Sequence, residues 1–292
     1  MWQEKIEVIG PYHFDLALSR LAIDPLHIVD RKERTVKVPI YGKIPEVATV
    51  QAVGTTEKPA FLVSGFDHST KTYVLEKISF IFQLHTSLNK IQEHFSETAL
   101  KNIFDIHRGT PIVLDFSLYT TLIKSIIHQQ VNLAFAFSLT EQFVKTFGFQ
   151  IDGIPFYPTA KTVSGLHIEQ LRKLKFSQRK AEYIIDLSKS ITNGELNLED
   201  LSQQSDEYVM KELVKIRGIG PWTAQNFLLF GLGRPNLFPY ADIGIQNAMK
   251  QLYGLERKPT MEEMLNYSIE WHPYLSFASL YLWRSIEPKN EG

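Results

Sequence analysis

The N-terminal part of the chain contains short hydrophobic runs in which β-branched residues are frequent. Gly, Pro and Asp bound these runs, which is typical of strands in an antiparallel sheet. One segment, residues 14–21, instead has apolar residues at helical spacing. We therefore expect a small antiparallel sheet with one or two helices. The expected strands are residues 28–29, 35–40, 47–53 and 61–65.

From Ile78 onward the apolar residues follow a helical period. Val209, Leu213 and Ile216, for example, occupy positions i, i+4 and i+7, which lie on one face of a helix. No repeat of the length found in solenoid proteins is present. The pattern predicts an α+β fold, with an N-terminal α+β domain over residues 1–88 and an all-α domain over residues 89–292. The expected helices are residues 78–88, 98–104, 115–128, 133–147, 168–173, 177–192, 205–216, 221–231, 242–253, 261–271 and 273–285.

Composition narrows the class of protein. The chain has 292 residues, of which 44% are hydrophobic and 22% charged, as in an ordinary folded protein. It does not begin like a signal peptide, and no apolar run approaches the roughly 18 residues of a membrane span. We therefore expect a soluble, cytoplasmic protein without a membrane partner. The absence of cysteine excludes disulfides, Cys-based zinc sites and iron–sulfur clusters. Because the net charge is −1, any contact with nucleic-acid phosphates must be local.

A two-glycine turn, Gly218-Ile219-Gly220, separates two expected helices, and Pro221 opens the second of them. Two glycines separated by one residue permit positive φ and the close approach of a foreign group to the backbone. Successive N–H groups at such a turn form an anion site that accepts a phosphodiester. The alternative is a tight helical hairpin closed by glycine for steric reasons alone.

A single carboxylate, Asp242, stands in the apolar and aromatic segment 238–245, at the expected N-cap of a helix. N-terminal helix donors keep such a carboxylate ionised even in a dry pocket. A fixed anion beside a sugar stabilises the oxocarbenium-like transition state of glycosidic cleavage. The alternative is that Asp242 only caps its helix, and the two roles are compatible.

Taken together, several segments resemble the helix-hairpin-helix (HhH-GPD) DNA glycosylases, and among them the AlkA-type 3-methyladenine DNA glycosylases (DNA-3-methyladenine glycosylase II). Order and spacing agree from about residue 108 to residue 284. The resemblance implies a TBP-like sheet domain followed by the helical HhH-GPD domain. The matching segments are residues 126–131, 176–183, 213–224, 231–235, 238–242, 271–274 and 282–283.

The resemblance implies roles for the turn and the carboxylate. Asp242 corresponds to the catalytic residue of the family. The family's hairpin grips DNA phosphates, here through Gly218, Ile219, Gly220 and Thr223. In the family a monovalent cation often sits on backbone carbonyls of the hairpin. The matching carbonyls here are those of Ile216 and Ile219, and no catalytic metal or other cofactor is expected.

One residue inside the hairpin indicates the type of glycosylase. Bifunctional members carry a catalytic lysine where this chain has Trp222. Without that amine no Schiff base can form, so we expect a monofunctional enzyme without lyase activity.

The resemblance also indicates how a damaged base is reached. A glycosylase extrudes the base and fills the gap it leaves, and the turn at Gln129 and Gln130 matches the family's wedge. Gln130 is the expected intercalating residue, whereas an exposed polar linker is the alternative. Arg179, in a basic cluster over residues 172–180, is expected to contact DNA, although such a cluster is often only a solvated helix face.

Four residues are expected to line the substrate pocket. Trp222 and Trp283 match pocket aromatics of the family, and aromatic rings attract a cationic alkylated purine. Both tryptophans can also be plain core residues. Tyr240 lies next to the catalytic position, and Arg20 matches a pocket position that is aromatic in some relatives.

The expected function is hydrolysis of the N-glycosidic bond of alkylated purines in duplex DNA, which leaves an abasic site. Damaged double-stranded DNA is the expected partner of a monomeric enzyme in the bacterial cytosol or nucleoid. Two alternatives remain at this point. One is a glycosylase for deaminated or oxidised purines, and the other is a non-catalytic helix-hairpin-helix DNA-binding protein.

Overall fold

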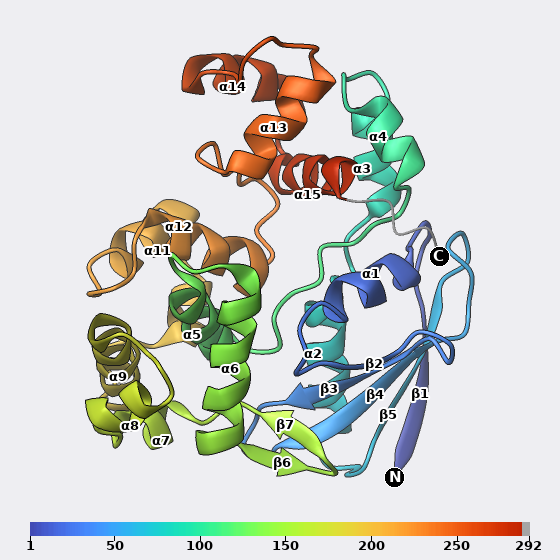
Figure 1. The fold of residues 1–292 in the computed structure, drawn as a ribbon. Helices are drawn as coiled ribbons and strands as arrows, with labels where there is room; N and C mark the ends of the chain where they lie inside the picture. Colours follow the sequence, from blue (N-terminus) through green and yellow to red (C-terminus); the bar gives the residue numbers. More distant parts are fainter. Residues whose placement is uncertain (288–292) are drawn as a thin grey trace.

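The computed structural model describes residues 1–287 and begins with a five-stranded antiparallel sheet (Figure 1). Its strand order is β1-β5-β4-β3-β2. Every second residue of β4 is buried, because successive side chains of a strand point to opposite faces. Trp2 is the only buried residue of β1. This edge strand therefore has no apolar run, and the sequence did not predict it. The strands are β1 Trp2–Glu7, β2 Ile28–Asp30, β3 Thr35–Ile40, β4 Glu46–Ala52 and β5 Ala60–Gly65.

Two helices contribute to the core of this sheet, α1 (Phe14–Leu21) and α2 (Lys71–Ile81). The sequence predicted α1 correctly but placed a helix over residues 78–88, which is wrong. The helix ends at Ile81, and Gln83 adopts a left-handed φ of 52°, so the chain turns away before the next helix begins.

The first group of helices, here called the hairpin lobe, lies on the left in Figure 1. It encloses its own hydrophobic core. The expected helical character is confirmed, although a short β-hairpin inside it was not predicted. This lobe consists of α5 Leu118–His128, α6 Leu133–Phe147, β6 Phe149–Ile151, β7 Ile154–Phe156, α7 Ala160–Ser164, α8 Ile168–Lys173, α9 Gln178–Thr192, α10 Leu198–Ser202, α11 Asp206–Leu213, α12 Pro221–Asn226 and a π-helical turn, Phe227–Gly231.

The second group, here called the C-terminal lobe, shares one continuous core with the sheet. Segments distant in sequence form it, as shown by the rings of Phe104 and Tyr281, which stack with centroids 3.7 Å apart. It consists of α3 Leu88–Phe95, α4 Lys101–Ile106, α13 Ile243–Leu252, α14 Met261–Ser268, a 3₁₀ turn Ile269–Trp271 and α15 Leu275–Ile286. The domain boundary at residue 88 stays a prediction, and residues 288–292 of the expected helical domain lie outside the described residues.

The architecture is therefore an antiparallel sheet joined to two helical lobes, as the α+β prediction required. Among residues 1–287, no helix combines the length and the hydrophobicity of a bilayer-spanning segment. The two lobes face each other across the chain segment that links α12 to α13, and α1 lies beside the C-terminal lobe (Figure 1).

Candidate active site and nucleic-acid interface

The glycine turn has the backbone geometry expected of an anion site. Gly218 has a φ of 92°, in the left-handed region, and Gly220 is the N-cap of α12 with extended backbone. The helix α11 ends at Leu213, earlier than predicted. Tight turns follow it, and in the last of them the N–H of Ile219 donates to the carbonyl of Ile216 at 3.0 Å. The first N–H groups of α12 are thus directed out of the turn, where a phosphate can accept from them.

Two neighbouring helices hold this turn in place. The side-chain amide of Gln129, just after α5, donates to the Gly218 carbonyl and to the Thr223 hydroxyl, both at 2.9 Å. On the other side the ring of Tyr183 packs so closely that a Cβ on Gly218 would lie 2.2 Å from it. Arg217 pairs with Glu182 of α9 at 2.5 Å. Contacts from both sides therefore fix the conformation of the hairpin.

A groove of about 700 Å³ runs beside the hairpin. Gln130 lies exposed at its edge with a left-handed φ of 53°, and exposed Arg179 lines it from the first turn of α9. Gln129 also lines the groove, but the hairpin uses both hydrogens of its amide nitrogen. The structure thus brings the predicted wedge turn, Arg179 and the hairpin to one surface.

Asp242 is the N-cap of α13, as the sequence predicted, and is partly buried. Its Oδ1 accepts from the N–H of Ile245 at 2.8 Å and from the indole N–H of Trp283 at 2.9 Å. Its Oδ2 has no hydrogen bond to any residue in the described part of the chain. A Cβ on Gly244 would lie 3.0 Å from Oδ1 and 3.3 Å from the indole, so a glycine gives this pair its room. One carboxylate oxygen is held while the other remains available.

A cavity of about 490 Å³ opens in front of Asp242 and meets the hairpin groove at Trp222, which is 47% exposed. Its walls come from all three parts of the molecule, with Arg20 from α1, Trp222 from α12 and Trp283 from α15. Tyr240 is not in the wall. Its hydroxyl lies 3.2 Å from the Ser268 hydroxyl and its ring packs edge-on against Phe238, so it is partly buried against the core and does not line the cavity, unlike the prediction.

Several wall residues carried no signal in the sequence. Leu133, Asn226 and Phe230 line the cavity, and their positions depend on the packing of α6 and on the π-helical turn after α12. π-Helical turns are often found at functional sites because they redirect side chains out of the regular ladder. Gly244 could have been noticed only from its position two residues after Asp242.

Comparison with known proteins decides which family this geometry represents. The HhH-GPD superfamily of base excision DNA repair proteins matches residues 123–273, more than half of the chain. The chain belongs to the HhH-GPD superfamily. The matched segment contains Gln129, the hairpin and Asp242, whereas Arg20 and Trp283 lie outside it.

Individual relatives agree with this assignment. The chain is 54% identical over 289 residues to YfjP of Bacillus subtilis (strain 168), covering 98% of this chain and all of YfjP, whose name assigns it provisionally to the DNA-3-methyladenine glycosylases. It is 28% identical over 55% of each chain to DNA-3-methyladenine glycosylase 2 of Escherichia coli (strain K12). A 3-methyladenine DNA-glycosylase structure from Archaeoglobus fulgidus has the same fold, with a TM-score of 0.84 over 98% of this chain and 99% of that chain, at 24% identity. This HhH-GPD protein therefore belongs to base excision repair.

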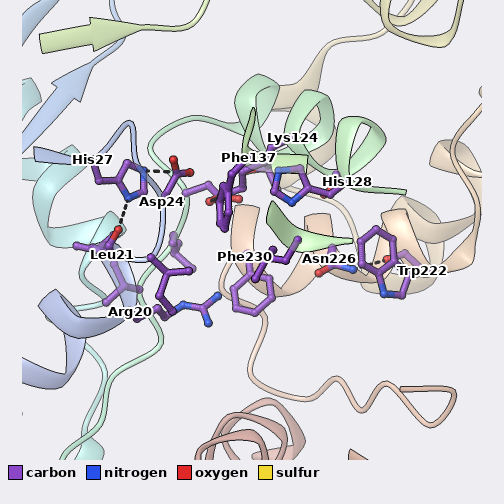
Figure 2. A pocket seen from close by; sticks show the side chains of 17 residues that line it. Arg20, Leu21, Asp24, His27, Lys124, His128, Phe137, Trp222, Asn226 and Phe230 are labelled. Carbon is purple, nitrogen blue, oxygen red and sulfur yellow. Dashed lines mark hydrogen bonds and ion pairs between the residues drawn. The ribbon is translucent and has the colours of Figure 1, made fainter. Parts of the chain in front are cut away.

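A second cavity of about 280 Å³, shown in Figure 2, has more charged residues in its wall than the first. The two share wall residues, among them Arg20, Phe230 and Asn226. The wall of the second cavity also contains an ion pair between Lys124 and Asp115 and a contact between His27 and Asp24 at 3.8 Å. Charged residues that follow α1 and lie at or near α5 therefore line the second cavity of this HhH-GPD protein.

His128, in the wall of the second cavity, makes stability depend on pH. Burial, followed by the nearby Lys124, lowers the pKa of His128 to about 4. The unfolded chain takes up this proton near pH 6.5, so neutral His128 stabilises the fold above that pH, and the contribution is lost as the pH falls toward 4. Between pH 7 and pH 5 the wild type should therefore lose about 2 kcal/mol of unfolding free energy through His128, and His128→Gln should be spared this loss.

Urea unfolding at the two pH values measures this effect. His85→Gln, at an exposed position, is the matched control and should lose as much stability as the wild type. If His128→Gln also shows the full wild-type loss, the protonation of His128 is not coupled to folding.

Proposed function

We propose that this chain is a monofunctional DNA glycosylase that hydrolyses the N-glycosidic bond of alkylated purines such as 3-methyladenine in double-stranded DNA. The observation that carries the proposal is Asp242, which is held through Oδ1 at the wall of a cavity of about 490 Å³ that opens to the hairpin groove. The names of YfjP and of the Escherichia coli relative support the substrate class. We place the activity in the cytoplasm, with one copy of the chain acting on one lesion.

Asp242 acts on the sugar in this proposal. As the bond between C1′ and the base nitrogen lengthens, positive charge develops on the sugar ring, and a nearby carboxylate stabilises it. The free Oδ2 is suited to orient the water that adds to C1′. Because Trp283 and Ile245 fix Oδ1, the charge is in place before the reaction and needs no reorganisation.

The hairpin binds the DNA backbone beside the lesion. Backbone N–H groups near Gly218, Ile219, Gly220 and Thr223 donate to a phosphate without reading sequence. The carbonyl of Ile219 accepts no hydrogen bond within residues 1–287, so it is free for a monovalent cation together with the second lone pair of the Ile216 carbonyl. Such a cation would add electrostatic attraction for the same phosphate.

Gln130 is the proposed wedge. Its exposed side chain and left-handed backbone direct it outward, whereas neighbouring Gln129 is tied to the hairpin. An amide side chain fills the space of the extruded base and can hydrogen-bond the unpaired partner base. Exposed Arg179 adds phosphate attraction that weakens with salt.

Base release without strand cleavage tests the proposal. Incubated with methylated DNA, the protein should release 3-methyladenine, and the strand should break only after alkali or heat. Because Trp222 has no amine, borohydride should trap no covalent protein–DNA adduct. Base release is measured by chromatography and adducts by denaturing electrophoresis.

Two results would contradict it in different ways. Tight binding of lesion DNA without any base release would indicate a non-catalytic DNA-binding protein. A borohydride-trapped adduct would show that another amine of the chain forms a Schiff base and would overturn the monofunctional assignment.

A further inference from the structure

Arg20 is the residue through which the sheet part of the molecule reaches the cavity in front of Asp242. It lies in the last turn of α1 and lines the second cavity, as Figure 2 shows. It also lines the cavity in front of Asp242. Its guanidinium carbon lies 4.3 Å from the ring centroid of Phe230, which is itself a wall residue of both cavities. The guanidinium is therefore a positive, planar group held on an aromatic ring at the place where the two cavities join.

Within residues 1–287 this guanidinium has no hydrogen-bonding or ionic partner. No hydrogen bond and no ion pair is formed by Arg20, whereas Arg34 and Arg234, which are also partly buried, pair with Asp15 and Asp206. Burial lowers the pKa of Arg20, and only the more distant charges of Asp115 and Glu287 oppose this. Partial burial of an unpaired charge costs free energy, which a ligand in the cavity can recover by accepting its hydrogen bonds.

The chemistry of the guanidinium favours some bases over others. It carries five N–H donors and no acceptor, so it pairs with a carbonyl oxygen and not with an amino group. It also repels a base that is itself positively charged, as a purine nucleotide alkylated at a ring nitrogen is. A neutral base with a carbonyl group, such as hypoxanthine, can accept hydrogen bonds from the guanidinium and is not repelled by its charge.

We propose that Arg20 is a specificity-determining residue that extends the substrate range to neutral, carbonyl-bearing purines; the inference rests on the glycosylase activity proposed above. When the C1′–N9 bond breaks, its electron pair stays on the leaving base, and water adds to C1′. In a neutral base the resulting negative charge spreads to the carbonyl oxygen, where Arg20 donates. The proton released by the water then neutralises the base. A cationic alkylated purine leaves as a neutral molecule and needs no such donor.

The test compares two substrates with one set of variants. Single-turnover release of hypoxanthine from a defined duplex and of 3-methyladenine from methylated DNA is measured for the wild type, Arg20→Met and Arg20→Lys. Arg20→Met keeps most of the side-chain length without charge or donors. Its hypoxanthine rate should fall and its 3-methyladenine rate should rise, so that their ratio shifts by at least about tenfold. Arg20→Lys keeps the charge without the planar fork and should lie between.

Arg31→Met, at an exposed position of the same sheet part, is the matched control and should leave the ratio unchanged. Equal losses on both substrates in Arg20→Met would show a purely structural role and overturn the inference. So would a wild type that releases 3-methyladenine but no hypoxanthine, which leaves the proposed function standing. A wild type that releases neither base would overturn the proposed function itself.

Discussion

Asp242→Asn should reduce the single-turnover rate of base release by about 10³-fold or more while the variant still binds DNA. Asparagine has the same shape, and its side-chain oxygen can still accept from the N–H of Ile245 and from the indole of Trp283. The cap of α13 and the cavity wall are therefore retained. Only the negative charge beside the sugar is lost, and that charge is what the oxocarbenium-like transition state requires.

Base release and binding must be measured separately on the same variant. Release is followed from methylated DNA, and binding by fluorescence anisotropy on a duplex with an abasic-site analogue. Asp30→Asn is the matched control, because the Asp30 carboxylate also accepts two backbone N–H groups but lies in an exposed turn of the sheet. If Asp242→Asn retained activity within about tenfold of the wild type, Asp242 would serve only as a helix cap.

The parts of the site that the sequence predicted are those with a local signal. The turn at Gly218 and Gly220 follows from glycine and proline chemistry over a few residues, and the cap at Asp242 from its position before an apolar-periodic helix. Strands β2 to β5 and most helices were predicted for the same reason, whereas β1, β6 and β7 were not. Hydrophobic period and turn residues act over a short stretch of chain, so one sequence is enough to read them.

The parts that could not be predicted depend on contacts between distant segments. Gln129 supports the hairpin from 89 positions away, and Trp283 holds Asp242 from 41 positions away. Tyr240 shows the opposite error, since this residue is close to Asp242 in sequence but packs against the core and does not line the cavity. That Arg20 lacks a hydrogen-bonding or ionic partner also depends on how α1 packs against the two helical lobes. Residue spacing along the chain does not contain this information.

Gly218→Ala should weaken DNA binding by at least about tenfold and lower the thermal stability, with a cost of about 1–3 kcal/mol. Two independent causes act at this position. The backbone φ of 92° disfavours any side chain, and the new Cβ would lie 2.2 Å from the ring of Tyr183. Either the turn opens or Tyr183 moves, and both changes displace the N–H groups that we expect to face a phosphate.

Gly220→Ala separates the effect of the turn on stability from its effect on DNA binding. At Gly220 there is neither a positive φ nor a steric clash for the new methyl group. Gly220 has a φ of −94°, and a Cβ there has no atom of the protein within 4 Å. The variant should therefore melt close to the wild type, because alanine restricts the unfolded chain but is a poorer N-cap than glycine, and the two effects oppose each other. If a phosphate approaches this backbone as proposed, the added methyl group still lowers DNA affinity. Wild-type DNA affinity in both variants would show that the hairpin is a structural turn and that the DNA backbone binds elsewhere.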